Sequence, residues 1–372
     1  MPHRVVFAPD SFKGTIGAAA AADALARGWA SVRHGDDLQL LPMADGGEGT
    51  VDAFATAVPE ARRMPITVTG PEGAPVAASW LLLPADADGV VTGVVELAST
   101  SGIELLGTPP RLRALDAHSR GFGEAIAAAL AHGADRLVLG IGSSASTDGG
   151  VGMLTALGAR FTDAEGQPIA EGGRGLADVA GVDLTALAAL PARGVTVLGD
   201  VTNPLLGPSG AAAVFGPQKG ADAAQIAELD AGLARLAALL GVDPSSLGAG
   251  AAGGTGYGLR AWGATIVPGS EAVADLIGLR AAVAAASVVI TGEGSFDGQS
   301  AAGKVPAHVA ALAAETGVAV ALVAGRITTD ADTSAFAGTA SLTVLAGSPD
   351  AAMADPARWL AAAGAELAHE LA

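Results

Sequence analysis

The feature that most constrains this chain is a short apolar run followed at once by a glycine-rich loop that carries an acidic residue. The pattern recurs along the sequence, because RVVFA leads into PDSFKGT, LQLLP into MADGGEG, and SVVIT into GEGSFDG. Uninterrupted apolar runs of this length are typical of strands buried on both faces, as in parallel sheets. Apolar residues at helical spacing, such as Ala18, Leu25 and Trp29, follow the first loop. The sequence therefore predicts an α/β fold.

Near Met64 the pattern changes from strand, loop and helix units to short strand-like runs. The segments ITVTGPEG, VAASWLLL and GVVTGVVELA are short strand-like runs separated by turn residues, and they predict an antiparallel meander. Strand, loop and helix units return in the last third of the chain. We therefore predict a Rossmann-like, doubly wound parallel sheet built from both chain ends, residues 1–63 plus 284–372. The second domain, residues 64–283, is predicted to be an inserted mixed α/β domain.

Three further segments carry structural predictions. The stretch GAGAAGGTGYG, residues 248–258, is rich in glycine, but no change of composition follows it. We predict an ordered loop there rather than a flexible linker. A helix is predicted to begin at Val305-Pro306, because proline suits the first turn of a helix. The runs VAVALVAG and SLTVLAG nearer the C-terminus are both predicted to be strands.

Composition excludes several classes of protein. The 372 residues include no cysteine, which rules out disulfides, a thiolate nucleophile and cysteine-based zinc sites. The six histidines have no metal-ligand spacing, and the net charge of −18 repels nucleic acid and anionic membranes. The sequence shows neither a signal peptide nor a spanning apolar run. We expect a cytoplasmic protein with no nucleic-acid and no membrane partner.

Lysine is rare in this chain: of the 20 basic residues only Lys13, Lys219 and Lys304 are lysines. Each of them stands next to a glycine in a loop-like stretch. Phosphate sites combine a compact ammonium group with exposed backbone N–H groups. We therefore predict that these lysines contact an anionic ligand.

Two glycine patterns suggest nucleotide sites of other kinds. Gly140-Ile-Gly142-Ser-Ser-Ala145 matches a variant of the dinucleotide fingerprint and keeps a Rossmann-type NAD(P)-dependent oxidoreductase as an alternative. Asp148 follows it in the same loop, where a pyrophosphate would be repelled. The stretch from Gly298 to Val305 resembles a P-loop, but valine stands where Ser or Thr would ligate Mg2+. A third reading is a non-catalytic sensor that binds a nucleotide or a sugar acid.

A set of acidic residues stands in or beside the glycine-rich turns. Any one of them could be a turn former, but together they fit phosphoryl transfer, which needs carboxylates on Mg2+ and one to accept the proton of the acceptor hydroxyl. The set is Asp10, Asp45, Glu48, Asp148, Asp200, Glu293 and Asp297.

Six motifs together resemble the bacterial glycerate kinase family, of the type without a P-loop. They are APDSFKGT, MADGGEGT, GIGSSASTDGG, GDVTNPLLG, AAVFGPQKGA and TGEGSFDGQSAAGK, between residue 5 and about residue 325. The resemblance implies ATP-dependent phosphorylation of D-glycerate to 2-phosphoglycerate, with ATP and Mg2+ as cofactors. It implies two α/β domains with the active site in the cleft between them. It leaves open whether the protein is a homo-oligomer.

The resemblance also implies which residues form the site. Asp10, Lys13 and Asp200 are the expected catalytic residues, and Asp200, Glu293 and Asp297 the expected metal ligands. Lys13 and Lys304 are assigned to phosphate or to the glycerate carboxylate, and Asp10 or Asp200 to the general base. The residues expected to bind substrate or nucleotide are Ser11, Asp45, Gly46, Gly47, Ser144, Asp148, Asn203, Lys219, Lys304 and Arg326.

Three positions depart from the family pattern. Ser295 stands where an arginine is common, Arg120 stands where a tyrosine is common, and GIGSSASTDGG replaces the commoner GIGGSATNDGG. Losing a guanidinium from an anion site costs affinity unless another replaces it. We expect Arg326, which follows an apolar run at a strand end, to be that replacement.

Overall fold

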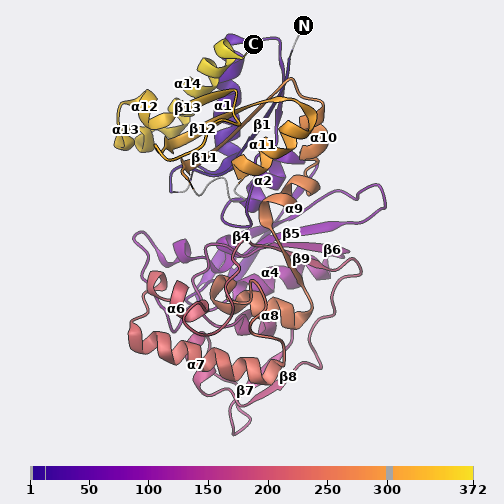
Figure 1. Ribbon diagram of the computed structural model, residues 1–372. Helices are drawn as coiled ribbons and strands as arrows, with labels where there is room; N and C mark the ends of the chain where they lie inside the picture. The colour runs from indigo at the N-terminus through magenta and orange to yellow at the C-terminus, as the bar shows by residue number, and fades with distance from the viewer. Residues whose placement is uncertain (1–2, 13, 299–304, 372) are drawn as a thin grey trace. The chain divides into compact units, whose positions relative to one another are not determined.

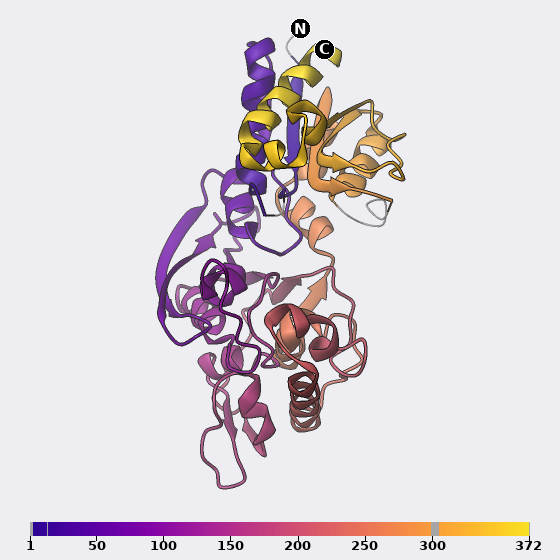
Figure 2. The ribbon, with the colours of Figure 1, turned by 90° about the vertical axis from the view of Figure 1, so that its left-hand side faces the viewer.

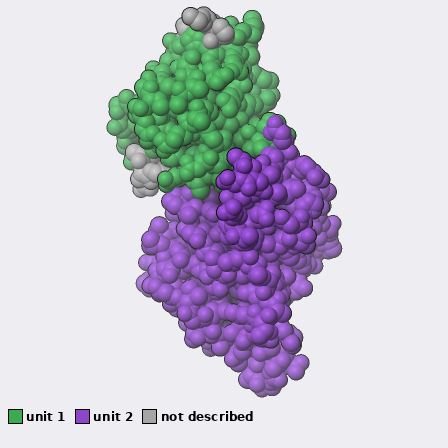
Figure 3. All heavy atoms as spheres, turned by 90° about the vertical axis from the view of Figure 1, so that its right-hand side faces the viewer, with its two compact units in different colours: residues 1–45, 52–59, 270–372 green, residues 46–51, 60–269 purple. Residues whose placement is uncertain are grey.

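The computed structural model describes residues 3–12, 14–298 and 305–371, which fold into two compact units (Figures 1 and 3). Unit 1 comprises residues 1–45, 52–59 and 270–372, and unit 2 comprises residues 46–51 and 60–269. The sequence analysis places the later boundary at 283/284 instead. The short helices α9 (Gly269–Leu276) and α10 (Leu279–Ala284) occupy the residues between the two boundaries, and α10 packs against the next helix, α11 (Val305–Thr316).

Unit 1 is built on a five-stranded parallel sheet. Its strands, in sequence, are β1 (Arg4–Pro9), β2 (Asp37–Leu40), β11 (Val288–Phe296), β12 (Ala319–Ile327) and β13 (Gly338–Ser341). Their order in the sheet is β13-β12-β11-β1-β2, and all the pairs are parallel. This is the order of a doubly wound sheet, in which the strand order reverses between β1 and β11. Ligands of such sheets bind beyond the carboxyl ends of the strands at that point.

Helices cover both faces of this sheet. Helix α1 (Ala18–Val32) and helix α14 (Pro356–Glu370) lie side by side on one face, and Figures 1 and 2 show the pair from two directions. Their apolar residues share a core with one face of β1, β11 and β12, and Trp29 contacts Phe7 edge to face. Helix α11 contacts β1, β11 and β12. The described residues of this unit also form helices α12 (Leu342–Ala346), α13 (Pro349–Ala354) and most of α2 (Thr50–Ala57), whose first two residues belong to unit 2.

The prediction of a strand over SLTVLAG, residues 341–347, is wrong for most of that range. Strand β13 ends at Ser341, and Leu342–Ala346 form helix α12. Leu342 is buried whereas Val344 is 77% exposed. Residues two apart share a face in a strand but lie on opposite sides of a helix, so this burial pattern requires the helix.

The loop predicted after SVVIT is also corrected. Strand β11 continues to Phe296, so Glu293 and Ser295 lie within it. The reason is the length of β12, which pairs with β11 as far as Ile327. The predicted helix start at Val305 is confirmed.

Unit 2 contains a six-stranded mixed sheet. Its strands are β3 (Arg62–Thr69), β4 (Pro75–Leu82), β5 (Thr92–Glu96), β6 (Arg136–Gly140), β9 (Val195–Leu198) and β10 (Thr265–Val267). Their order is β10-β9-β6-β5-β4-β3, with β5, β6, β9 and β10 parallel. Strands β3, β4 and β5 pair antiparallel, which confirms the predicted meander. A separate hairpin pairs β7 (Arg160–Thr162) with β8 (Gly181–Asp183).

Helices pack around this sheet and share one apolar core. They are α3 (Ala98–Ser101), α4 (Arg120–Ala131), α5 (Val151–Ala156), α6 (Ala211–Phe215), α7 (Ala223–Leu240) and α8 (Thr255–Trp262), with short 3₁₀ turns between some of them. The core includes Phe122, Leu139, Leu154, Leu233 and Tyr257. The glycine-rich stretch 248–258 is ordered, as predicted, and runs through a 3₁₀ turn into α8. Over the described parts of both units, no helix combines the length and apolarity that crossing a membrane requires.

Candidate functional site

Glycine-rich segments meet at the carboxyl ends of the parallel strands of unit 2. The segment 46–51 lies against the ends of β6 and β9, because the N–H of Gly142 donates to the carbonyl of Gly46 at 2.9 Å. A Cβ on Gly46 would lie 2.4 Å from the carbonyl oxygen of Leu198, and its φ of +93° also favours glycine. The N–H of Val51 donates to the buried carboxylate of Glu96 at 3.0 Å. The predicted binding residues Gly46 and Gly47 thus lie beside the loop 141–149.

Asp148 is buried at the base of that loop and accepts four hydrogen bonds. The backbone N–H and the hydroxyl of Ser119 donate to its Oδ2 at 2.8 and 2.7 Å. The N–H groups of Gly150 and Gly152 donate to its two oxygens at 3.1 and 3.2 Å. Asp148 therefore ties the loop to the start of α4 and to α5. The sequence analysis missed Ser119, for which the only local signal was its position directly before a helix.

Lys219 is also buried, with 2% of its surface exposed. Its Nζ donates to the Oγ of Ser144 at 2.8 Å and to the carbonyl of Ser146. Burial lowers the pKa of Lys219 to about 7, although the nearby Asp148 acts in the opposite direction. Ser144, Asp148 and Lys219, all predicted to bind substrate or nucleotide, are thus brought together inside unit 2.

Two predicted residues follow strand β9. Asp200 is exposed, and its Oδ1 accepts the N–H of Gly269 at 2.8 Å. The side-chain amide of Asn203 donates to the backbone carbonyl of Ser209 at 2.8 Å, and the backbone carbonyl of Asn203 accepts the N–H of Gly250 at 2.9 Å. Asn203 therefore holds the loop after β9 in shape, and Asp200 ties the start of that loop to Gly269.

Four predicted residues of unit 1, Asp10, Ser11, Glu293 and Arg326, lie at the carboxyl ends of β1, β11 and β12. Asp10 follows β1, where its N–H donates to the carbonyl of Gly292 in β11 at 2.8 Å, and its Oδ1 accepts the N–H of Ser11 at 2.6 Å. Glu293 lies on β11 next to this contact and is buried. Asp10 and Glu293 therefore stand where the strand order reverses.

The remaining predicted residues of unit 1 are more exposed. Asp45 and Asp297 are half-buried, and Asp297 directly follows β11. Arg326 is exposed on β12 directly opposite Ser295, and its Nη2 donates to the Oγ of Ser295 at 3.3 Å. The guanidinium expected to compensate for Ser295 thus contacts that serine. Lys13 and Lys304 lie outside the described residues.

The other two departures from the family pattern, at Arg120 and Ser143, both lie in unit 2. Arg120 forms ion pairs with Glu124 and Glu171, each at 3.1 Å, on unit 2. Ser143, where a glycine is commoner in the family, has a φ of +57°. A non-glycine residue in the left-handed region is uncommon and strained. The loop therefore keeps a conformation suited to glycine.

The dinucleotide fingerprint does not have the geometry that its chemistry needs. In a Rossmann fingerprint the glycine loop opens directly into a helix whose N-terminus binds the pyrophosphate. Here Ala145 is followed by further loop, and α5 begins only at Val151. The buried carboxylate of Asp148 occupies the turn before that helix. The oxidoreductase alternative therefore loses its structural basis.

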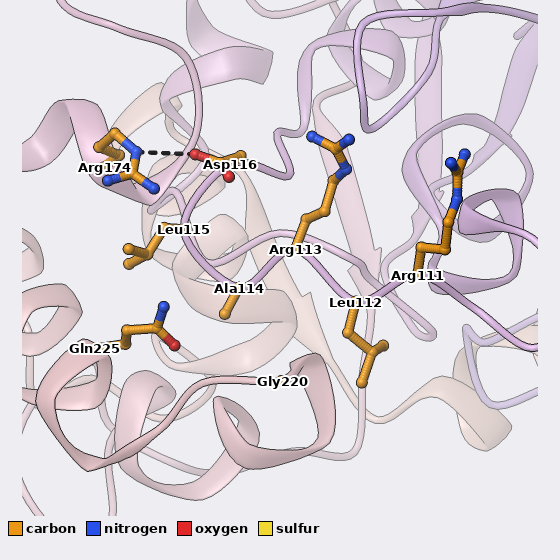
Figure 4. Close-up of a pocket in the computed structure, with 9 residues that line it drawn as sticks. All are labelled: Arg111, Leu112, Arg113, Ala114, Leu115, Asp116, Arg174, Gly220 and Gln225. Carbon is orange, nitrogen blue, oxygen red and sulfur yellow. Dashed lines mark hydrogen bonds and ion pairs between the residues drawn. The ribbon is translucent and has the colours of Figure 1, made fainter.

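Figure 4 shows a cavity of about 400 Å³ in unit 2 that the sequence analysis did not predict. Its charged groups are paired: Arg174 with Asp116 at 2.9 Å, and Arg111 and Arg113 with Glu72 at 3.4 and 3.5 Å. None of the predicted site residues lines it. The lining residues are Arg111, Leu112, Arg113, Ala114, Leu115, Asp116, Arg174, Gly220 and Gln225.

A metal site would have to use separate carboxylates. Among the described residues, no group of three His, Asp or Glu side chains is gathered closely enough to hold an ion by itself. Mg2+ is usually held by one or two carboxylates together with substrate phosphates, so such a group is not required. The carboxylate oxygens of Asp200, Glu293 and Asp297 are hard ligands that fit this ion.

Comparison with known proteins gives consistent results. A family model described as the glycerate kinase family matches residues 5–372. The glycerate kinase of Bacillus subtilis (strain 168) is 42% identical over 336 residues, 88% of this chain and 86% of that protein. The glycerate 2-kinase of Escherichia coli (strain K12) is 42% identical over 334 residues, with the same shares covered. A crystal structure of a Salmonella typhimurium LT2 protein assigned as glycerate kinase 2 is similar with a TM-score of 0.84 and 38% identity, covering 99% of this chain and 98% of that one.

Proposed function

Because this chain belongs to the glycerate kinase family and is a kinase, we propose that it transfers the γ-phosphoryl group of ATP to D-glycerate and forms 2-phosphoglycerate. The observation that carries the proposal is the position of the family motifs. Four of the six stand at the carboxyl ends of the parallel strands β1, β2, β6 and β9, the place where α/β sheets bind their ligands. The E. coli relative is a glycerate 2-kinase by name, which supports the 2-phosphoglycerate product.

We assign the proton transfer to unit 1. Asp10 is half-buried at the point where the strand order reverses, and a carboxylate there can accept the proton of the glycerate hydroxyl. Lys13 and Lys304 are proposed to bind phosphate or the glycerate carboxylate. Arg326 supplies a guanidinium beside Ser295, where the family commonly has its own arginine.

Unit 2 supplies hydrogen-bond donors for anionic oxygens. The segment with Gly46 and Gly47 lies against the loop that carries Ser144, so backbone and hydroxyl groups are close together. Asp148 and Asn203 support this arrangement through their internal hydrogen bonds. Donors fixed in advance stabilise developing charge without a cost of reorganisation during the reaction.

Asp200, Glu293 and Asp297 are the residues that would hold Mg2+. The ion would neutralise charge on the phosphate oxygens during transfer. Glu293 is buried on a strand and is therefore fixed in position, whereas Asp200 is exposed on a loop. We expect substitution of either to raise the Mg2+ concentration needed for half-maximal rate.

The proposal is tested by ³¹P NMR of the purified protein with MgATP and D-glycerate, with L-glycerate and no-acceptor samples as controls. The expected result is ADP together with a 2-phosphoglycerate signal only in the D-glycerate sample. A 3-phosphoglycerate signal would keep the kinase but contradict the proposed product. Binding of both ligands without ADP formation would favour the non-catalytic sensor. The predicted cytoplasmic location and the exclusion of nucleic-acid and membrane partners stay predictions.

A further inference from the structure

The buried amino group of Lys219 has specific partners inside unit 2. Lysine is rarely buried completely unless it is paired, because the ammonium loses its hydration. Here the side chain is 2% exposed, and its Nζ reaches Ser144 Oγ at 2.8 Å and the carbonyl of Ser146. Both acceptors lie in the loop 141–149, which also carries the buried Asp148. Lys219 therefore bonds to the loop at two points.

The backbone around Lys219 leaves room for this contact. Gly253, from the glycine-rich stretch 248–258, approaches the amine so closely that a Cβ would lie 2.9 Å from Nζ and 2.0 Å from the carbonyl oxygen of Ser146. Its φ of +66° also disfavours any other residue. This explains why glycine is needed at position 253: the backbone there covers the Lys219 contact and excludes water from it.

The contact also settles what the hydroxyl of Ser144 can do. A serine hydroxyl has one proton to donate and can accept two hydrogen bonds. Because Ser144 accepts from Nζ, its own proton points elsewhere. The neighbouring Ser143 is held in the left-handed region, and its carbonyl accepts the N–H of Ile103 at 2.9 Å, so the backbone is fixed on this side too.

We propose that Lys219 is a positioning residue: it holds the loop 141–149 and orients the Ser144 hydroxyl to donate to an anionic oxygen of a substrate. Lys219 itself does not touch the ligand, since its amino group is enclosed by the loop and by Gly253. This differs from the sequence-based prediction that Lys219 binds substrate or nucleotide directly. The anionic oxygen is either a phosphate oxygen of the nucleotide or the glycerate carboxylate.

The test is a double-mutant cycle on the full chain, and its kinetic part rests on the proposed function. Lys219→Met, Ser144→Ala and the double variant are compared by kcat/KM, with separate KM values for ATP and glycerate. We expect Lys219→Met to lower kcat/KM by about tenfold or more, the usual effect of losing a hydrogen bond to a charged group. Adding Ser144→Ala to Lys219→Met should then change it less than about twofold. Effects that multiply instead would overturn the proposal.

The two KM values distinguish the sources of the anionic oxygen. A rise in the KM for ATP assigns the Ser144 hydroxyl to a phosphate oxygen, and a rise in the KM for glycerate assigns it to the carboxylate. Ser144→Ala with unchanged kcat and unchanged KM values would contradict the proposal. Arg235→Met, which removes an exposed cation from α7, is the matched control and should behave like the unsubstituted protein.

Two further measurements separate this proposal from the proposed function and from a purely structural role. Hydrogen exchange of the amides in 141–149 should increase in Lys219→Met but not in Arg235→Met, whether or not glycerate is the substrate. Lys219→Gln keeps a donor and should recover part of the activity that Lys219→Met loses, whereas a packing role would not favour Gln over Met. If neither Lys219 variant folds, the side chain is structural and the proposal is wrong.

Discussion

The loop after β6 in unit 2 and the ends of β1 and β12 in unit 1 present their side chains in opposite ways. In unit 2, Ser144, Asp148 and Lys219 are buried and bonded within the protein. In unit 1, Asp10 is half-buried and Arg326 is exposed. A buried polar network is costly to break, because the groups left behind lose both water and partner. Substitutions in the unit 2 network should therefore change both stability and activity. Substitutions of the more exposed residues at the strand ends of unit 1 should change activity alone.

The largest expected effect is that of Asp148→Ala. It leaves the donors of Ser119, Gly150 and Gly152 without their acceptor in a buried site. We expect a loss of about 3–5 kcal/mol in the free energy of unfolding and no measurable activity. Urea denaturation followed by circular dichroism measures the loss, with the exposed Glu165→Ala as control. A loss below about 1 kcal/mol would contradict the conclusion that the buried network of unit 2 is costly to break.

Asp10→Asn in unit 1 should have a large effect on activity and little effect on stability. If Asp10 is the general base, kcat falls by about 10²- to 10⁴-fold. The free energy of unfolding should change by less than about 1 kcal/mol, because asparagine can still accept the N–H of Ser11. Steady-state kinetics and thermal unfolding are measured on the same preparation, with Asp23→Asn on the exposed face of α1 as control. Unchanged kcat would remove Asp10 from the mechanism.

Arg326→Ala should produce a moderate effect confined to binding. The guanidinium is exposed, so its loss should leave the stability unchanged. We expect the KM for glycerate or ATP to rise by about tenfold, since hydrogen bonds to anions are the strong ones. Arg280→Ala, which removes another exposed guanidinium of unit 1, is the control. Equal KM values in the two variants would show that Arg326 does not replace the missing arginine at Ser295.

Asp36 lies in unit 1 but its side chain is buried, so it tests whether the stability effect of a substitution depends on burial or on the unit. Burial raises the pKa of Asp36, but hydrogen bonds from Arg33, Trp29 and the N–H of His3 outweigh it and lower the pKa to about 2. Asp36→Ala should cost about 1–2 kcal/mol near neutral pH. Because the folded pKa lies below the unfolded value of about 4, this contribution is present above pH 4 and is lost as the pH falls toward 2.

Chemical denaturation of Asp36→Ala at several pH values measures this dependence, and the exposed neighbour Asp37→Ala is the control. A stability difference between Asp36→Ala and the unsubstituted protein that stays constant from pH 7 to pH 2 would contradict the assignment. The expected result would show that a buried carboxylate stabilises either unit when its partners are internal.

The smallest expected effect is a gain. Ser143→Gly removes the side chain from a residue with a φ of +57° and should stabilise unit 2 by about 0.5–1 kcal/mol. Thermal unfolding measures the change, and Ser99→Gly in the short helix α3 is a control that should destabilise instead. A loss of stability in Ser143→Gly would show that the serine side chain contributes more than its backbone strain costs.

Local patterns in the sequence determined much of this protein. The apolar runs before the glycine-rich loops are indeed parallel strands, and the meander after Met64 is antiparallel, because alternation and turn residues act over a few neighbours. The family follows from motifs whose order is preserved along the chain. These features require no knowledge of which segments meet in space.

The tertiary structure alone decided which polar groups are internal. Lys219 and Ser144 are 75 residues apart, and Ser119 and Asp148 are 29 apart, so no local pattern reveals these pairs. The same holds for α12, where packing against β12 replaced a predicted strand by a helix. A hydrogen bond between distant segments depends on the whole fold bringing them together, whereas strand and helix periodicity are encoded within each segment. The sequence therefore predicted residues for the candidate site, and the structure showed which of them are bonded to one another inside unit 2.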